Sequence, residues 1–367
     1  MLLEVKPKQS CCCQVDHFDN PFVQEVFVRA GEGRVTAGKI HIAQAGGYRF
    51  PFEIFSNAAS LGARVARFWA HGYGPVGGAF WDPDNLFVRN EKDFCNGLDH
   101  LAQTSGVDVL LWPYFPIDTS EYRWLSGWVK NRLGEGDMSR IVMSRLHERA
   151  FMQSDPSAME ARCCGLSLSR NKRRTTGRQE RRLKELGSLR FESTAKGLGH
   201  GDALEQFFKV EASGWKGLSG TALAANPDML AFARDFMPDL LAAGRLQIDM
   251  LMLEDRCISA LASFRAGNGL FTWKTGMDEV YKRYSPGVQI LLEVSRQVMA
   301  NPDVDYIDSL ADSGHPVAEH IWSGRRRLAV LFVPLTEKGR VACRGMKLGY
   351  QVNDTARQWA KRLLGRV

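Results

Sequence analysis

The second half of the chain alternates apolar and polar positions in blocks that are typical of short helices and strands. The apolar spacing within 202–210 predicts a helix. Asn226 and Pro227 predict the start of a second helix that ends near Ala243, because asparagine caps helices and proline suits the first helical position. Apolar and polar alternation then predicts an antiparallel meander of three strands, at 246–253, 257–265 and 270–277.

The rest of this half repeats helix and strand signals in turn. One apolar face predicts a helix over 287–300. It is followed by a strand over 304–310, a short helix over 317–322 and a strand over 328–335. A small amphipathic helix is predicted at 351–364. Before that last helix, the order is helix, helix, three antiparallel strands, helix, strand, helix, strand.

The first half of the chain is less regular. Residues 1–30 show no periodicity and predict a tail with at most one edge element. The glycines of 72–78 predict a loop. Around that loop, the pattern predicts a helix that starts within Ile54–Leu61, strands at 64–69 and 107–112, and a helix at 94–103.

The composition is typical of a soluble globular protein, with 44% hydrophobic and 24% charged residues. Charged residues interrupt every apolar stretch before it is long enough to span a membrane, and the charged N-terminal residues do not resemble a secretory signal. We therefore expect no membrane span and a cytoplasmic location. The eight cysteines lack metal-ligand spacing, so neither a disulfide framework nor a metal site is predicted.

One segment carries almost the whole net charge of +7. Between Arg170 and Glu185 lie eight basic residues and two acidic ones, which suits a solvent-exposed helix that connects two halves. Two interpretations stay open: a solvated connector without a ligand, or a strip that attracts phosphate groups or anionic lipid. In the second case, Arg173 and Arg174 are candidate binding residues.

The sequence Ser-Pro-Gly at 285–287 predicts a helix start that can bind an anion. The serine is expected to cap the helix, and the first amides of a helix have no partners within it. The glycine lets a phosphate approach the backbone. The candidate residues of this pyrophosphate site are Lys282, Arg283, Ser285, Gly287 and Val288. The alternative is that these residues only start a helix.

Lys274 stands in the middle of the predicted strand 270–277. Strict alternation places its side chain on the same face as Leu270 and Thr272. Because an unpaired buried ammonium is costly, Lys274 needs a carboxylate, a solvated cleft or a bound anion. Direct pairing with Asp278 would need a bend in the strand.

Other polar residues are candidates for substrate binding or proton transfer. Trp215 and Lys216 lie in a loop between two predicted helices, where the tryptophan either stacks on a substrate or packs in the core. Asp278 follows the central strand, and Asp308 ends the next one. Carboxylates at strand ends are candidates for proton transfer.

With this order of elements, the second half resembles the GNAT acyltransferase fold. More specifically, it resembles the CelD-type acetyltransferase-like family, which is related to the FemAB peptidoglycan aminoacyltransferases. The residues that carry the resemblance are 170–187, 214–217, 274–278, 284–287, Asp308 and Trp322, together with the loop 72–77 in the first half. The resemblance implies an α/β (α+β) fold with two GNAT-like halves, each a mixed, mostly antiparallel sheet flanked by helices.

The resemblance also implies the organisation of the chain. The expected parts are a tail at 1–30, a first, degenerate GNAT-like half at 31–165, a basic connector helix at 166–187, an acyltransferase half at 188–335 and a C-terminal helical segment at 336–367.

The activity that the resemblance implies is acyl transfer from a thioester, usually acyl-CoA, to an amine or hydroxyl. The family relatives suggest polysaccharide or envelope metabolism by analogy. The GNAT phosphate loop is Arg/Gln-x-x-Gly-x-Gly/Ala, and only Arg283 and the Ser-Pro-Gly at 285–287 stand in its place here. In this chemistry, Asp278 or Asp308 accepts the proton of the acceptor. Tyr284 protonates the leaving thiolate, and Lys274 or Arg283 holds the donor phosphate.

Two alternatives stay open. In the FemAB branch the donor is an aminoacyl-tRNA, which would give Arg173 and Arg174 a role in binding RNA. A protein of a different class would bind an anion or a polysaccharide on the same fold without catalysing a reaction.

Overall fold

The computed structural model describes residues 16–36, 38–81, 88–133, 141–154, 166–214, 217 and 219–363. The chain divides into two compact units. The central unit contains Glu148–Arg326, and the flanking unit contains Asp16–His147 and Arg327–Val367. No helix in the described part of the chain is long and apolar enough to cross a membrane.

The central unit is built on a mixed sheet in which the strand order is β6, β11, β10, β9, β8, β7. Neighbouring strands are antiparallel except β10 and β11, which are parallel. The strands are β6 (Val142–Gln153), which belongs to this unit from Glu148 on, β7 (Leu189–Ser193), β8 (Leu246–Leu253), β9 (Arg256–Ala266), β10 (Gly269–Met277) and β11 (Tyr306–Asp308). The predicted meander is therefore confirmed as β8, β9 and β10.

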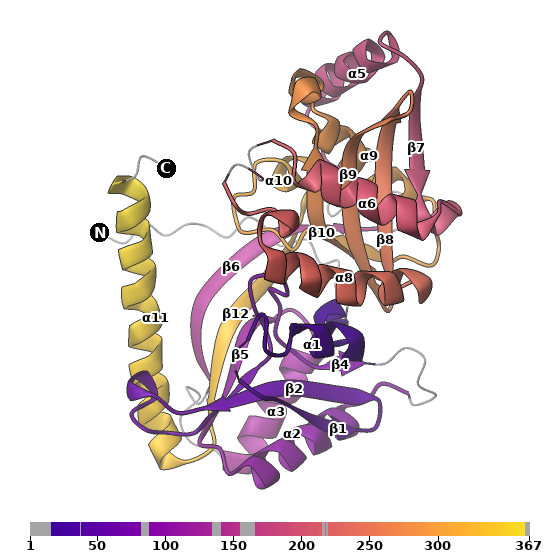
Figure 1. The fold of residues 1–367 in the computed structure, drawn as a ribbon. Helices are drawn as coiled ribbons and strands as arrows, with labels where there is room; N and C mark the ends of the chain where they lie inside the picture. Colours follow the sequence, from indigo (N-terminus) through magenta and orange to yellow (C-terminus); the bar gives the residue numbers. More distant parts are fainter. Residues whose placement is uncertain are drawn as a thin grey trace. The chain divides into compact units, whose positions relative to one another are not determined.

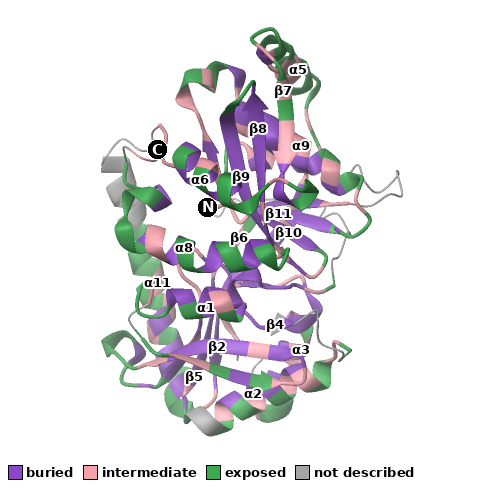
Figure 2. Cartoon of the chain, turned by 45° about the vertical axis from the view of Figure 1, so that its right-hand side comes forward, coloured by how far each residue is buried: buried purple, intermediate pink, exposed green. Residues whose placement is uncertain are grey.

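Helices cover both faces of this sheet (Figure 1). α6 and α8 pack on one face, while α9 packs on the other, and α5 follows the edge beside α9 (Figures 1 and 2). The helices are α5 (Arg170–Lys184), α6 (His200–Glu211), α8 (Pro227–Ala242), α9 (Pro286–Met299) and α10 (Ala318–Ile321), with 3-10 turns η3 (Thr194–Lys196), η4 (Leu223–Ala225) and η5 (Glu279–Tyr284). The Asn226 side chain accepts the Asp228 and Met229 amides, so the predicted cap is confirmed.

The strands of the flanking unit follow the order β1, β2, β3, β5, β12, with β4 paired to β2. Its strands are β1 (Ile40–Ala45), β2 (Tyr48–Phe55), β3 (Val65–Phe68), β4 (Phe80–Trp81), β5 (Val109–Pro116) and β12 (Gly324–Pro334). Its helices are α1 (Glu25–Gly31), α2 (Glu91–Ser105), α3 (Ser120–Leu133) and α11 (Glu337–Leu363), with 3-10 turns η1 (Pro21–Val23) and η2 (Ala58–Ser60). The mixed α/β fold expected from the sequence is confirmed.

The two predicted halves exchange a strand. β6 follows the elements of the first half along the chain, yet it pairs with β11 of the central unit. β12 follows the elements of the second half, yet it pairs with β5 of the flanking unit. The expected boundaries at 165 and 335 do not show this exchange, because strand pairing is decided by contacts that are distant in sequence.

Three predictions about the flanking unit are wrong. Within the expected tail, residues 16–30 are folded, and Phe22 and Phe27 are fully buried. The segment Ile54–Leu61 does not start a helix, because its first residues end β2 and the rest forms a 3-10 turn. The C-terminal helix begins at Glu337 rather than near 351. The sequence pattern did not indicate this earlier start, because glycines at several positions weaken the helix signal.

Candidate functional site

The parallel strands β10 and β11 separate in the middle of the sheet. They pair only from Gly269–Phe271 on β10, where Phe271 lies opposite Asp308. β11 ends there, while β10 continues to Met277. The backbone edge of β10 beyond Phe271 therefore has no partner in β11, and α9 begins close to the end of this open edge.

A β-bulge at Trp273 changes the direction in which the next side chains point. Thr272 pairs with Ser263 of β9, and Lys274 pairs with Ala262, so Trp273 is the extra residue. Since Ser263 and Ala262 are consecutive, Thr272 and Lys274 lie on opposite faces of the sheet. The prediction that they share a face is wrong, because strict alternation does not anticipate a bulge.

Lys274 consequently points toward α6, where its partner is Glu211. The ammonium Nζ lies 3.7 Å from Oε1 of Glu211, a carboxylate whose side chain is fully buried. Lys274 also donates to the carbonyl of Thr221 at 3.4 Å, and Glu211 Oε2 accepts the Leu223 amide at 2.8 Å. Burial lowers the pKa of Lys274, and the Glu211 carboxylate opposes part of that shift.

Close approach of α6 to β10 makes this pairing possible. A Cβ on Gly276 would lie 2.6 Å from the backbone of Glu211, so only glycine allows the helix to come this near. The sequence predicted that Lys274 needs a carboxylate, a cleft or an anion. Glu211 is that carboxylate, and no local signal marked it, because it looks like an ordinary residue at the end of a helix.

The start of α9 differs from the predicted cap. Ser285 adopts the left-handed conformation, with φ of 52°, and its side chain makes no capping hydrogen bond. Instead, Gln179 of α5 donates to Ser285 Oγ and to the Arg283 carbonyl, both at 3.0 Å. The expected role of Ser285 as the cap is therefore wrong, since its hydroxyl is engaged by α5.

Two of the three predicted amides have partners inside the chain. Val288 and Gln289 donate to the Ser285 carbonyl at 2.9 and 3.1 Å. Among the described residues, the Gly287 amide has no such backbone partner. A Cβ on Gly287 would lie 3.8 Å from its nearest neighbour, Met277 Sδ, so the space at this amide is open. The anion site predicted here is thus reduced to Gly287 and the basic residues beside it.

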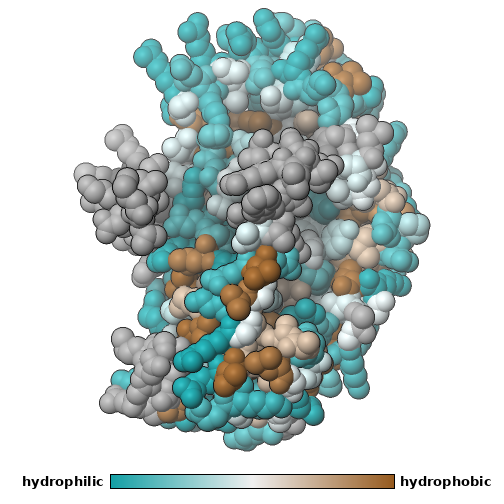
Figure 3. Space-filling view, turned by 90° about the vertical axis from the view of Figure 1, so that its left-hand side faces the viewer, coloured by the Kyte–Doolittle hydropathy of each residue, from teal (hydrophilic) through white to brown (hydrophobic). Residues whose placement is uncertain are grey.

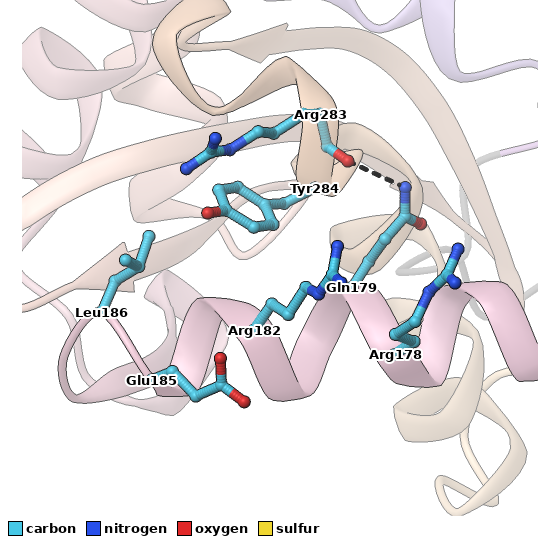
Figure 4. Close-up of a pocket in the computed structure, with 7 residues that line it drawn as sticks. All are labelled: Arg178, Gln179, Arg182, Glu185, Leu186, Arg283 and Tyr284. Carbon is cyan, nitrogen blue, oxygen red and sulfur yellow. Dashed lines mark hydrogen bonds between the residues drawn. The ribbon is translucent and has the colours of Figure 1, made fainter.

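One of those basic residues, Arg283, lines a pocket of about 350 Å³ between α5 and η5 (Figure 4). The lining residues are Arg178, Gln179, Arg182, Glu185, Leu186, Arg283 and Tyr284. The Arg283 guanidinium lies 4.7 Å from the centre of the Tyr284 ring. Three guanidinium groups against one carboxylate give the pocket a positive charge, which favours an anionic ligand.

Two glutamines attach the basic helix to the start of α9. Besides the Gln179 bonds, Gln289 donates to the Thr176 carbonyl of α5 at 3.0 Å. The sequence predicted a basic strip and an anion-binding turn as separate features, and the structure brings them together. Arg173 and Arg174 are exposed and do not line the pocket. Much of α5 is exposed, as its green colour in Figure 2 shows.

The sequence analysis missed the two α5 arginines that do line the pocket. Leu183 is the buried residue of α5, and Gln179 lies one turn before it on the same face. Arg178 directly precedes Gln179, and Arg182 directly precedes Leu183. The spacing of Leu183 and Leu186 was the signal that could have identified this face.

The comparisons with known proteins identify the central unit. Residues 170–315 match a family model described as an acetyltransferase (GNAT) domain. The central unit contains a GNAT domain. No curated protein matches the chain.

Solved structures share the fold at low sequence identity. FemX is 10% identical, with a TM-score of 0.51 over 86% of this chain and 92% of its own. A conserved protein of unknown function from Bacteroides thetaiotaomicron VPI-5482 is also 10% identical, with a TM-score of 0.50 over 86% of this chain and 93% of its own. At this identity the likeness shows the fold alone, and it covers both units.

In the GNAT domain, Asp308 is fully buried and ion-paired. Arg149 donates to its Oδ2 at 2.8 Å, and the Arg149 Nε lies 2.6 Å from Oδ1. Arg326 approaches Oδ2 at 3.5 Å. An acceptor cannot reach this carboxylate, so the structure contradicts its predicted role as a proton acceptor. Asp308 instead neutralises charge at the end of β11.

Asp278 is also engaged within the GNAT domain. Its Oδ2 lies 2.5 Å from an Arg256 guanidinium nitrogen, and its Oδ1 accepts the Val280 amide at 3.0 Å. Both oxygens therefore hold the start of η5 in place. This geometry favours a structural role for Asp278 over the predicted proton transfer.

The remaining candidates are placed as follows. Lys282 is exposed on η5, and its carbonyl accepts the Ser285 amide at 3.0 Å. Tyr284 is buried and lines the basic pocket. Trp215 and Lys216 lie outside the described residues.

Proposed function

We propose that the GNAT domain transfers an acyl group from an acyl-CoA thioester to an amine or hydroxyl acceptor. The observation that carries this proposal is the position of the open β10 edge, which is close in the chain to a helix start flanked by a basic pocket. A donor with a phosphate-rich head and an extended thioester arm matches both features.

The head of the donor occupies the positive end of this site. Its pyrophosphate is held by the Gly287 amide and the Arg283 guanidinium, which combine a helix start with a full positive charge. Arg178 and Arg182 in the pocket take a further phosphate, and Tyr284 offers a ring face to the adenosine. Ser285 and Val288 shape the turn, and their amides already donate to carbonyls within the chain, while Lys282 lies exposed beside them.

The thioester arm lies along the part of β10 that extends beyond its pairing with β11. A backbone N–H on this edge donates to the thioester carbonyl and stabilises the oxyanion, a contribution of about 2.7–4 kcal/mol. Holding the acceptor next to the carbonyl removes about 7–11 kcal/mol of barrier through proximity. Such chemistry needs few side chains.

Lys274 is the group that we assign to proton transfer. It lies directly after the bulge, its side chain is 19% exposed, and burial lowers its pKa toward the working range of a general base. Its amine takes the proton as the acceptor attacks the carbonyl carbon. The carbon–sulfur bond then breaks, and the resulting ammonium returns the proton to the thiolate. Glu211 positions Lys274 for this exchange.

A second candidate donor is an aminoacyl-tRNA. The specific observation that favours it is the exposed basic surface of α5, including Arg173 and Arg174, next to the pocket. Since RNA binding releases counterions, tRNA affinity would fall steeply with salt and would depend on these two arginines.

Calorimetric titration with coenzyme A, dephospho-coenzyme A and bulk tRNA distinguishes the donors. We expect coenzyme A to bind, and to bind more tightly than its dephospho form, whereas Arg178→Ala together with Arg182→Ala removes that difference. Tight binding of tRNA without binding of coenzyme A would favour the second candidate.

Turnover is measured as thiol release from acetyl-CoA with panels of amines, hydroxyls and sugars. We expect Lys274→Met to lower the rate about a hundredfold or more and to remove the limb on which the rate rises with pH. Binding of coenzyme A without turnover on any acceptor would favour a non-catalytic binding protein. An unchanged pH profile in Lys274→Met would place the proton acceptor elsewhere.

A further inference from the structure

The last helix of the flanking unit, α11, has two apolar faces, and its own unit covers only one of them. The covered face, which packs on β3, β5 and β12, consists of Ala342, Cys343 and Met346. Val341, Leu348 and Val352 are 56%, 61% and 62% exposed. Their spacings of seven and four residues place them in one stripe on the opposite side of the helix.

The exposed stripe continues onto a neighbouring turn. Leu61, which follows η2, is 60% exposed. Its Cδ1 lies 3.7 Å from the point where a Cβ on Gly345 would be. Gly345 lies between Val341 and Leu348 along the stripe. Figure 3 faces this side of the molecule and shows hydrophobic side chains gathered among hydrophilic ones. A contiguous group of exposed aliphatic side chains is typical of a docking surface.

The same helix is strongly basic. Residues 337–363 include seven lysines and arginines and two acidic residues. One of the acids, Asp354, is already bound by Arg145 at 2.5 Å. Arg340, Arg344 and Lys347 each precede a position of the aliphatic stripe by one residue. A row of cations therefore follows one side of the stripe.

We propose that this face of α11 docks on the surface of an anionic phospholipid bilayer. The aliphatic stripe enters the interface between headgroups and acyl chains, while the row of cations contacts lipid phosphates. Neither the aliphatic stripe nor the row of cations would by itself indicate a bilayer. An acidic protein or an RNA would pair with the cations and leave the aliphatic side chains in water.

Two features of the helix disfavour other occupants. A second copy of the chain would bring two rows of like charge together, which is unfavourable. A protein that wraps an amphipathic helix in a groove needs most of its circumference, and here one side is held by the core of the flanking unit. A flat surface needs only the side that α11 leaves exposed.

Sedimentation with vesicles tests this proposal on the full-length protein. The vesicles contain either phosphatidylcholine alone or phosphatidylcholine mixed with phosphatidylglycerol. We expect binding to the mixed vesicles and little binding to the neutral ones. Replacing the stripe by Leu348→Glu with Val352→Glu should lower binding at least about tenfold. Arg344→Ala with Lys347→Ala should lower it by about fivefold for each cation removed and weaken its salt dependence.

Matched controls separate this surface from general charge and from instability. Val88→Glu changes an 81% exposed side chain elsewhere in the same unit and should leave binding unchanged. Arg173→Ala with Arg174→Ala removes charge from α5 and should also leave it unchanged. Circular dichroism checks that each variant is folded, and acyl turnover is measured separately, so that failure of docking and failure of the proposed reaction are distinguishable.

Several outcomes would overturn the proposal. It is wrong if the wild-type protein does not sediment with anionic vesicles, or if the stripe variant binds as well as the wild type. Loss of binding in the α5 variant alone would assign the contact to that helix. A dimer in light scattering that the stripe variant dissociates would show that a second copy covers this face.

Discussion

The same strand–helix–strand arrangement occurs in both units, and only one copy has the features of an anion-binding site. In the central unit, α9 connects the parallel strands β10 and β11, and in the flanking unit, α2 connects the parallel strands β3 and β5. Both parallel pairs are short. What distinguishes the two copies is how far the first strand extends beyond its partner and how the helix begins.

The first difference lies in the strands. β3 ends at Phe68, one residue beyond its paired segment, whereas β10 continues from Phe271 to Met277 without its parallel partner. In the flanking unit, the Phe68 and Trp112 rings stack with centroids 3.8 Å apart and fill the end of the strand pair. In the central unit, β10 extends beyond the end of β11 instead.

The second difference lies in the helix starts. The Asn90 side chain caps α2 by accepting the Asp93 amide at 2.8 Å, and Glu91 and Asp93 make that first turn acidic. The start of α9 has no side-chain cap, and Arg283 lies just before it. An anion is therefore repelled from α2 and attracted to α9. The shared fold provides the position, and a few residues decide whether it can bind a ligand.

The largest effect on stability is expected at Asp308, which ends β11 beside β10. Asp308→Ala leaves Arg149 and Arg326 buried beside a missing carboxylate, so the free energy of unfolding should fall by about 3–5 kcal/mol, as measured by urea denaturation. A variant that stays as stable as the wild type but loses turnover would instead show that Asp308 takes part in the reaction.

The two units should respond in opposite directions to pH. Burial raises the pKa of Asp249, on β8, to about 6. Because this value exceeds the unfolded value of about 3.9, the contribution of Asp249 to stability is complete below that unfolded pKa and is lost as the pH rises through 6. In Asp249→Asn, up to about 3 kcal/mol of this pH dependence should disappear from thermal unfolding curves.

The flanking unit contains the opposite case. Burial lowers the pKa of His71 to about 3, below the unfolded value of about 6.5. Its contribution to stability is therefore present above the unfolded pKa and is lost as the pH falls. His71→Phe should flatten the acid side of the stability curve, while Asp249→Asn flattens the side toward neutral pH. Identical curves for both variants and the wild type would contradict these assignments.

Gly287→Ala tests the helix start without disturbing its packing. The added methyl group meets no atom closer than 3.8 Å, so we expect the melting temperature to stay the same or rise slightly. The affinity for coenzyme A should fall about tenfold or more, as measured by calorimetry, because the methyl group occupies the space next to the Gly287 amide. Gly201→Ala, a change at an open position of α6, is the control and should leave affinity unchanged.

The smallest expected effect is on unfolding free energy, in variants that compare the starts of α2 and α9. Asn90→Ala removes a cap and should cost about 1 kcal/mol of unfolding free energy without altering donor affinity. Ser285→Ala removes no capping bond and should cost less, as shown by parallel urea titrations. Equal losses in the two variants would mean that the helix starts are not as different as their hydrogen bonds indicate.

Local patterns in the sequence predicted most elements of the central unit. The cap at Asn226 and the meander of β8, β9 and β10 depend on neighbouring residues, so their positions can be read along the chain. The bulge at Trp273, the pairing of Lys274 with Glu211 and the exchange of β6 and β12 depend on residues that are distant in sequence. Periodicity does not report such contacts.

The candidate site shows the same limit. The basic stretch and the turn at 285–287 were each recognisable from composition and motif, but the bonds made by Gln179 that join them were not. The arginines of α5 that line the pocket could be separated from the others only once the packing face of α5 was known.

The strand exchange sets an order for folding during synthesis. The sheet of the flanking unit lacks β12 until residues up to Pro334 have left the ribosome, although most of this unit is translated first. The central unit already contains β6 by then, so β6 can pair with β11 before β12 pairs with β5 of the flanking unit. The strands β1 to β5 are therefore joined by β12 only after the central unit has been translated.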